Sequence, residues 1–186
     1  MDQDFNKKIK NKRNRKNALI IVVIAIAVGL LLTTKIEGAK GFVNRITGNN
    51  KVTIEIRCDE LSEDMSKLKK PELEKYVPKD GVILKETEYA VDKDTTVFDI
   101  LDTACREHDI QIEYSYTPIY KSYYIEGINY LYEFDGGKRS GWTFTVDGEY
   151  PEYGASKIKL YGGEKIVWSY TCDYTKNDKV KESKDK

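Results

Sequence analysis

The chain of 186 residues has room for one ordinary domain with short appendages, and its 31 basic and 31 acidic side chains cancel. The charge is unevenly spread, because residues 1–17 hold seven cations against Asp2 and Asp4 and so carry +5. The remaining residues therefore carry −5, which excludes the basic surface that a nucleic-acid-binding protein needs.

The first element in chain order is an apolar run. Residues 18–32 contain no charged side chain, and Thr33 and Thr34 extend the run to residue 34. A helix of this length spans about 25 Å, which is the short end of a transmembrane segment. The basic residues before it predict that residues 1–17 form a cytoplasmic tail and that the later residues lie outside the cell.

A cleaved signal peptide is the alternative for the same run, since a basic start and an apolar core are common to both. Cleavage requires small residues three apart just behind the apolar core. The nearest pair, Ala39 and Gly41, lies far downstream, behind Lys35 and Glu37. The sequence therefore favours an uncleaved signal anchor in the cell membrane, with a linker at 35–50, a domain at 51–174 and a disordered charged tail at 175–186.

The domain begins with two predicted strands and one helix. Residues 51–58 alternate between apolar and polar side chains, which is typical of a strand buried on one face, and residues 82–91 return as a second strand. Apolar side chains then recur at spacings of three and four over residues 97–108, so we expect an amphipathic helix capped by Thr95 or Thr96.

The second half of the domain reads as strands and turns. Residues 111–116 predict a short strand, and residues 122–134 predict two short strands around Gly127. The pair Asp147–Gly148 favours a tight turn after a strand at 142–146, and residues 157–172 predict a second hairpin that turns at Gly162 and Gly163.

This order predicts an α+β fold in which one main helix packs on a mixed sheet. Strand, strand, helix and further strands suggest a β-grasp, with the first and last strands parallel neighbours in the middle. A sandwich is less favoured because the helix is too amphipathic to be a loop.

Three cysteines and one histidine limit the chemistry. Cys58 and Cys172 end the first and last strands on their apolar faces, so they are either bridged across the sheet end or are two buried thiols. Cys105 lies on the apolar face of the helix, where we expect core packing.

No catalytic or metal-binding set emerges from the sequence. His108 is the only histidine and falls at a helix end, which suits contact with the terminal carbonyls. Asp92 and Asp94 lack the alternating acids and the distal glutamate of a calcium loop. The sequence therefore predicts no enzyme, no metal and no cofactor.

Four segments resemble a known family. They are "VFDIL" at 97–101, "EGINYLYEFD" at 126–135, "SGWTFTVDGEYPEYG" at 140–154 and "GGEKIVWSYT" at 162–171. In this order they resemble the transcobalamin-C-terminal-like domain family over residues 52–174. The resemblance implies a β-grasp module that binds a soluble ligand; in the vitamin carriers this module covers one face of cobalamin.

The resemblance also implies a site. Trp142 and the loop at 150–154 fall where the carriers' small domain approaches the corrinoid. Two departures stand out: Gly136 and Ala155 occupy places where bacterial relatives often carry cysteine, and we expect no counterpart, among these residues, of the large helical domain that supplies most of the carriers' grip.

The aromatic residues divide by position. Core packing is expected for the aromatic side chains that alternate with polar ones along strands, together with their aliphatic neighbours on the same face. These residues are Phe144, Val146, Ile166, Trp168 and Tyr170. Trp142 follows a glycine-rich loop, where core packing and a ligand platform are both open. Loop position favours a contact surface for Tyr150 and Tyr153. The candidate ligand-binding residues are Ser140, Trp142, Tyr150, Pro151 and Tyr153.

Two functions remain open from the sequence. The first is a membrane-anchored, extracytoplasmic module for a small soluble ligand, with a corrinoid such as cobalamin as the specific candidate. The second is a cell-surface module that binds a protein or a wall polymer through paired tyrosines at 123–124 and at 130 and 132.

Overall fold

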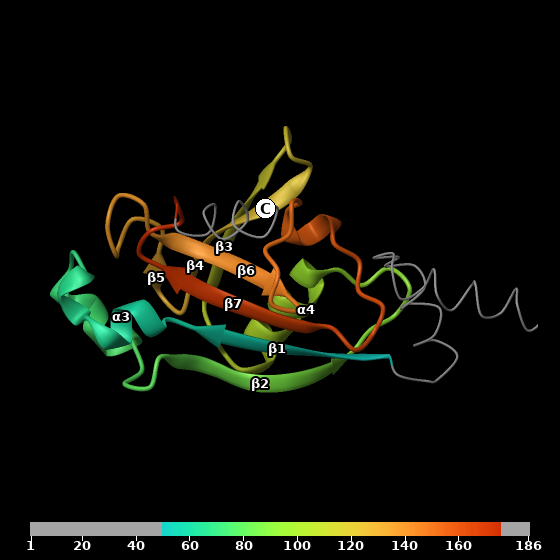
Figure 1. Cartoon of the computed structure of the whole chain (residues 1–186), viewed down its shortest axis with the longest axis horizontal. Coiled ribbons are helices and arrows are strands. Elements are labelled where there is room, and N and C mark those ends of the chain that lie inside the picture. Colours follow the sequence, from blue (N-terminus) through green and yellow to red (C-terminus); the bar gives the residue numbers. More distant parts are fainter. Residues whose placement is uncertain (1–49, 176–186) are drawn as a thin grey trace, which may run out of the picture. The chain divides into compact units, whose positions relative to one another are not determined.

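The computed structural model describes residues 50–175. These residues form two sheets and few helices (Figure 1). The predicted anchor at 18–34, the linker before residue 50 and the tail after residue 175 lie outside the described residues. Within residues 50–175, no helix is both long and apolar enough to cross a membrane.

The main sheet contains four strands in the order β2-β1-β7-β6. Its members are β1 (Lys51–Arg57), β2 (Val82–Ala90), β6 (Gly141–Val146) and β7 (Lys165–Thr171). β1 and β7 run parallel in the middle, with Ile54 opposite Ile166 and Ile56 opposite Trp168. The predicted adjacency of the first and last strands is therefore confirmed.

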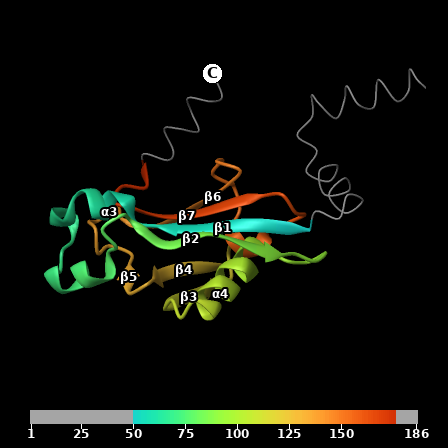
Figure 2. The ribbon, with the colours of Figure 1, turned by 90° about the horizontal axis from the view of Figure 1, so that it is seen from below.

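A second sheet replaces the single sheet that the sequence predicts. It consists of β3 (Ile112–Thr117), β4 (Ser122–Ile128) and the short β5 (Leu131–Tyr132), in that order. Together with the helix α4 (Val97–Glu107), it lies on one side of the main sheet (Figure 2). Ile125 and Ile128 of β4 join the same core as the helix, which explains why this hairpin packs on the main sheet rather than extending it.

The helix begins where the sequence predicts. The Thr96 hydroxyl accepts a hydrogen bond from the backbone N–H of Asp99, and the Asp99 carboxylate accepts one from the backbone N–H of Thr96. This capping box satisfies two backbone donors of the first turn. The buried side of the helix then meets the apolar face of β1 and β7, where Ile54, Ile56 and Ile166 have no exposed surface.

Two predictions about the later strands are wrong. The break expected at Gly127 lies instead at Asn129 and Tyr130, whose φ angles are 52° and 62°. Gly127 lies within β4 and pairs with Tyr132 of β5, whose ring packs over it; a Cβ at residue 127 would lie 2.7 Å from that ring.

The predicted hairpin at 157–172 does not form. β7 already has β1 on one side and β6 on the other, so no edge of β7 is left for residues 157–160. The chain before β7 instead forms the short 3-10 helix η3 (Ala155–Lys157) and a single bridge between Lys159 and Thr96.

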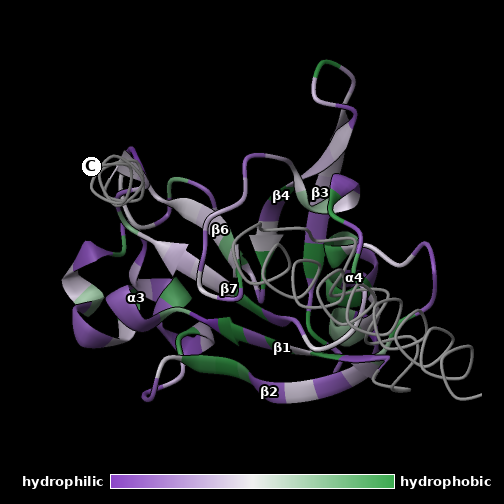
Figure 3. Ribbon diagram, turned by 45° about the vertical axis from the view of Figure 1, so that its right-hand side comes forward, coloured by the Kyte–Doolittle hydropathy of each residue, from purple (hydrophilic) through white to green (hydrophobic). Residues whose placement is uncertain are grey.

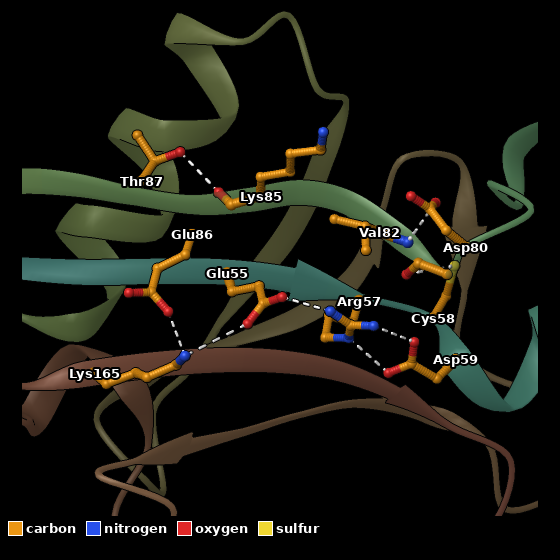
Figure 4. Close-up of polar contacts among 11 residues, drawn as sticks. Glu55, Arg57, Cys58, Asp59, Asp80, Val82, Lys85, Glu86, Thr87 and Lys165 are labelled. Carbon is orange, nitrogen blue, oxygen red and sulfur yellow. Dashed lines mark hydrogen bonds and ion pairs between the residues drawn. The ribbon is translucent and has the colours of Figure 1, made fainter.

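The other face of the main sheet is polar. Arg57 lies between the carboxylates of Glu55 and Asp59, and Lys165 of β7 pairs with Glu86 of β2 (Figure 4). Because Lys165 also pairs with Glu55 of β1, it links the three neighbouring strands β2, β1 and β7 (Figure 4). The alternation predicted for residues 51–58 therefore separates a charged face from the core.

The remaining segment, between β1 and β2, closes one end of the domain. It contains the helix α3 (Asp59–Glu63) and two 3-10 helices, η1 (Met65–Lys67) and η2 (Pro71–Tyr76). Leu61 of α3 has no exposed surface and packs in a second, smaller core with Leu131 and Tyr170.

Candidate functional site: a tyrosine-lined groove

A groove lies between the β3–β4 hairpin and the loop that precedes η3. The hairpin reaches beyond the rest of the described domain (Figure 3), and its end forms one wall of the groove. Residues 152–154 and Lys157 form the other wall. The groove has a volume of about 400 Å³, and we call it the tyrosine groove after the four tyrosines in its lining, Tyr120, Tyr123, Tyr124 and Tyr153.

Two serines and a glycine hold the walls together. The Ser156 hydroxyl accepts a hydrogen bond from the backbone N–H of Tyr123 at 2.9 Å and lies 3.1 Å from the Ser122 hydroxyl. Gly154 packs directly on Ser122, since a Cβ at residue 154 would lie 2.6 Å from the Ser122 Cβ and closer still to its hydroxyl. The loop therefore approaches the hairpin only because residue 154 has no side chain.

Tyr124 is the fixed member of the groove. Its hydroxyl donates a hydrogen bond to the Glu133 carboxylate at 2.6 Å. Burial, followed by this contact with Glu133, raises the pKa of Tyr124 well above its ordinary value. The phenol therefore stays protonated, and its ring is held at the groove wall.

Tyr120 and Tyr153 are the free members. These residues are 69% and 64% exposed. Within residues 50–175, neither hydroxyl has a hydrogen-bond partner and neither ring packs against another ring. These largely exposed rings are thus available to a ligand, at a low cost in side-chain entropy.

The charged residues of the groove balance. Glu152 and Lys157 lie on the loop wall, one acidic and one basic. Neither forms an ion pair with another residue of the described domain. The groove therefore combines exposed aromatic surface with one acidic and one basic side chain.

A second aromatic group covers the helix side of the same hairpin. The ring of Tyr123 stacks on Phe98 of α4 at 4.4 Å, and Tyr114 meets Phe98 edge-on at 4.8 Å. Tyr116 in turn meets Tyr123 edge-on at 5.6 Å. Because these rings pack on one another, they stabilise the hairpin against the helix.

The structure does not bring the five predicted site residues together. Tyr153 lines the groove, whereas Tyr150 and Pro151 are half-buried on the segment that leads to it. Burial, followed by the nearby Glu60 carboxylate, raises the pKa of Tyr150. The remaining two predicted residues, Ser140 and Trp142, belong to a separate cluster in the core.

Trp142 and Ser140 hold a buried loop in place. The indole N–H of Trp142 donates to the Leu131 carbonyl at 2.8 Å, and its ring meets Tyr170 edge-on. The Ser140 side chain is buried, accepts from the backbone N–H of Gly136 and lies 2.9 Å from the Tyr170 hydroxyl. The polar atoms of both predicted residues are therefore used by the protein itself.

The cysteines are all free. Arg57 lies opposite Ser169 in the parallel pair, so continuing this register puts Cys58 level with Tyr170 rather than with Cys172. Of the two alternatives that the sequence left open for Cys58 and Cys172, the structure has the unbridged thiols, with Cys58 buried and Cys172 half-buried, and the register offsets the two residues by two positions. Burial raises the pKa of the Cys58 thiol to about 12, which suits a packed side chain rather than a reactive one.

Tyr120, Glu152 and Lys157 line the groove but are not among the site residues predicted from the sequence. Tyr120 follows Pro118 in the turn between two tyrosine-rich strands, and this turn position was the available signal. Which residues of the later loop face that turn depends on the packing of Gly154 on Ser122, which no local pattern reveals. Within residues 50–175, no group of three or more histidine, cysteine or acidic side chains is placed to hold a metal ion.

Comparison with known families finds a model that matches part of the chain. Residues 94–172 match the model of a family described as "Domain of unknown function (DUF4430)". The matched segment runs from just before α4 to the end of β7, so it contains both walls of the tyrosine groove. No curated protein matches the chain.

Among solved structures, one similar chain comes from Ruminococcus gnavus ATCC 29149. It is a crystal structure at 1.30 Å resolution described as that of a "putative metal binding protein". The two chains are 14% identical, with a TM-score of 0.39, over 66% of this chain and 96% of that chain.

Proposed function

We propose that the described domain is a non-enzymatic binding module and that the tyrosine groove is its ligand site. The observation that carries the proposal is the pair of largely exposed rings, Tyr120 and Tyr153, on facing walls of one groove. The volume of the tyrosine groove, about 400 Å³, lies within the range usual for small-molecule sites. The groove is open on one side, so we expect weak binding.

The proposal includes location. A transmembrane anchor at 18–34 would leave the binding module outside the cell, facing soluble ligands or the cell envelope. Protease treatment of intact cells tests this location. We expect the domain to be digested while a tag placed before residue 1 is protected; protection of both would contradict it.

A corrinoid is the specific ligand that the resemblance to the transcobalamin-like domains suggests. Of the residues assigned to it, Tyr150, Pro151 and Tyr153 lie in or beside the groove wall, but Ser140 and Trp142 are engaged in the core. Calorimetric titration of the full-length protein with cyanocobalamin and cobinamide tests this form. Absence of binding at millimolar ligand would remove the corrinoid and leave the groove open to other ligands.

The second candidate is a cell-surface module that binds a protein or a wall polymer. The observation that favours it is the number of exposed tyrosines on one hairpin, including Tyr116 at 55% and Tyr124 at 48%. Capture from envelope extracts with the full-length protein tests this candidate. A partner whose recovery depends on Tyr116 and not on Tyr153 would favour it over the groove.

The site itself is tested by a thermal-shift screen of soluble ligands, because any ligand of the folded state raises the unfolding temperature. We expect the shift from a genuine ligand to disappear in Tyr153→Ala and to persist in Tyr130→Ala. Tyr130 is a matched control, since it is 46% exposed but stacks on Tyr76, outside the groove. A shift that survives both Tyr120→Ala and Tyr153→Ala would place the site elsewhere.

A further inference from the structure

The tyrosine groove also carries information on the chemical class of its ligand. Four tyrosines line it; the ring of Tyr123 stacks on Phe98, and the other three come from the β3–β4 turn, from β4 and from the loop before η3. Within the described domain, no two of the rings of Tyr120, Tyr124 and Tyr153 pack against each other. They therefore offer separate ring faces rather than one continuous aromatic plane.

Separate ring faces suit a ligand made of small units. Each tyrosine ring can cover the C–H face of one six-membered sugar ring, while a large flat macrocycle would need a single plane. The exposed faces of Tyr120 and Tyr153 lie on opposite walls, so two neighbouring sugar units could each meet one ring.

The charges and polar groups of the groove also favour a ligand made of sugar units. One acid and one base line it, Glu152 and Lys157, so no net charge selects an anionic or a cationic ligand. The carboxylate accepts hydrogen bonds and the ammonium donates them. Sugar hydroxyl groups both donate and accept, and Thr117 adds a hydroxyl of its own to the lining.

We infer that the tyrosine groove binds an uncharged saccharide, with Tyr120 and Tyr153 stacking on the sugar rings and Glu152 and Lys157 binding their hydroxyl groups. This inference rests on the proposed function, since it names the ligand class of the same groove. The open side of the groove lets a longer chain continue beyond the bound units, as a wall polymer would.

The test is an NMR titration of the ¹⁵N-labelled full-length protein in a mild detergent. The probes are chitotetraose and cellotetraose as uncharged saccharides, tetragalacturonate as an anion, chitosan tetramer as a cation, and cyanocobalamin. We expect an uncharged tetramer to move the amide resonances of Tyr153 and Gly154 with a Kd near millimolar. Because no ligand charge is involved, the Kd should change less than twofold over a tenfold rise in salt.

Variants assign the effect to the rings. Tyr120→Ala and Tyr153→Ala should each weaken saccharide binding by roughly twofold to tenfold, the range expected for a lost ring contact. Tyr130→Ala should leave the Kd unchanged. Equal effects of Tyr153→Ala and Tyr130→Ala would overturn the assignment.

The remaining outcomes separate this inference from the proposed function. Preferential, salt-sensitive binding of the anionic or the cationic tetramer would overturn the saccharide and keep the groove as a binding site. If the groove resonances respond to cyanocobalamin alone, the saccharide is overturned and the groove is a corrinoid site. If no probe moves the groove resonances, the saccharide is overturned, and the wider thermal-shift screen then decides whether the groove binds anything.

Discussion

The small core around Tyr170 and the tyrosine groove both depend on tyrosines, but the tyrosine of the core is buried and fully bonded, whereas those of the groove are exposed. The Tyr170 hydroxyl accepts from the Gly136 N–H, donates to the Tyr132 carbonyl and lies 2.9 Å from the Ser140 hydroxyl, while its ring is 2% exposed. Tyr153 is 64% exposed and has neither a ring partner nor a hydrogen-bond partner among the described residues. A tyrosine whose hydroxyl and ring are both engaged stabilises the fold, whereas one with both free is available to a ligand.

The largest effect that tests this contrast is truncation of Tyr170. We expect Tyr170→Ala to lower the free energy of unfolding by about 3–5 kcal/mol, because a buried aromatic ring is lost. Tyr170→Phe keeps the ring and leaves the partners of the hydroxyl unsatisfied, so it should cost about 1–3 kcal/mol. Urea unfolding of both variants measures these losses, and Tyr153→Phe is the matched control that should change nothing.

The contact that closes the groove gives the next largest effect. A methyl group at residue 154 would overlap Ser122, so Gly154→Ala should lower the free energy of unfolding by about 1–3 kcal/mol. The double variant Ser122→Gly with Gly154→Ala should recover part of this loss, because the overlapping hydroxymethyl group is removed. If urea unfolding shows purely additive losses, the close packing of the two walls is not the cause.

The pH dependence of stability distinguishes the same two regions. Burial raises the pKa of Tyr170 to about 12 from an ordinary value of 10.0. The unfolded chain therefore releases this proton first, and the contribution of Tyr170 to stability is complete below pH 10 and falls between pH 10 and 12. The slope from one such group is about 1.4 kcal/mol per pH unit.

Urea unfolding from pH 9 to pH 12 measures this slope. The buried thiols of Cys58 and Cys105, whose pKa values are also raised to about 12, add to it in every variant. Tyr170→Phe should therefore have a shallower slope than the unmodified protein, and Tyr153→Phe should have the same slope. Identical slopes for all three proteins would contradict the buried, fully bonded state of the Tyr170 hydroxyl.

The smallest expected effect on stability is at the groove itself. Tyr153→Ala should change the free energy of unfolding by less than about 0.5 kcal/mol, since an exposed side chain without partners is removed. Thermal unfolding monitored by circular dichroism measures the change. A loss comparable to that of Tyr170→Phe would mean that Tyr153 supports the fold.

The sequence predicted the central strands of the main sheet better than the second sheet that packs on it. The alternation of residues 51–58 and the strand that ends the domain placed β1 and β7 correctly, since one-sided burial leaves a clear period of two. The separate sheet of β3, β4 and β5 was missed. β4 carries the adjacent Tyr123 and Tyr124 on opposite faces, and the middle residues of β3 are all exposed, so the periodicity of these strands does not say which face is buried.

The candidate site could be predicted only in part, for a related reason. Loop position correctly marked Tyr153 as a surface residue, because rings in a loop have no periodic reason for burial. Trp142 and Ser140 start a strand next to a glycine-rich loop, and the sequence does not reveal that Leu131 and Tyr170 lie within hydrogen-bonding reach. Such contacts depend on tertiary packing between segments far apart in the chain.

The most direct test of the account is the NMR titration with chitotetraose carried out on Tyr153→Ala and Tyr170→Phe side by side, with stability measured on the same samples. The account predicts that Tyr153→Ala weakens binding roughly twofold to tenfold at unchanged stability, while Tyr170→Phe loses stability and keeps its affinity while folded. Loss of stability in Tyr153→Ala, or unchanged binding by it, would contradict the division of the tyrosines into core and groove.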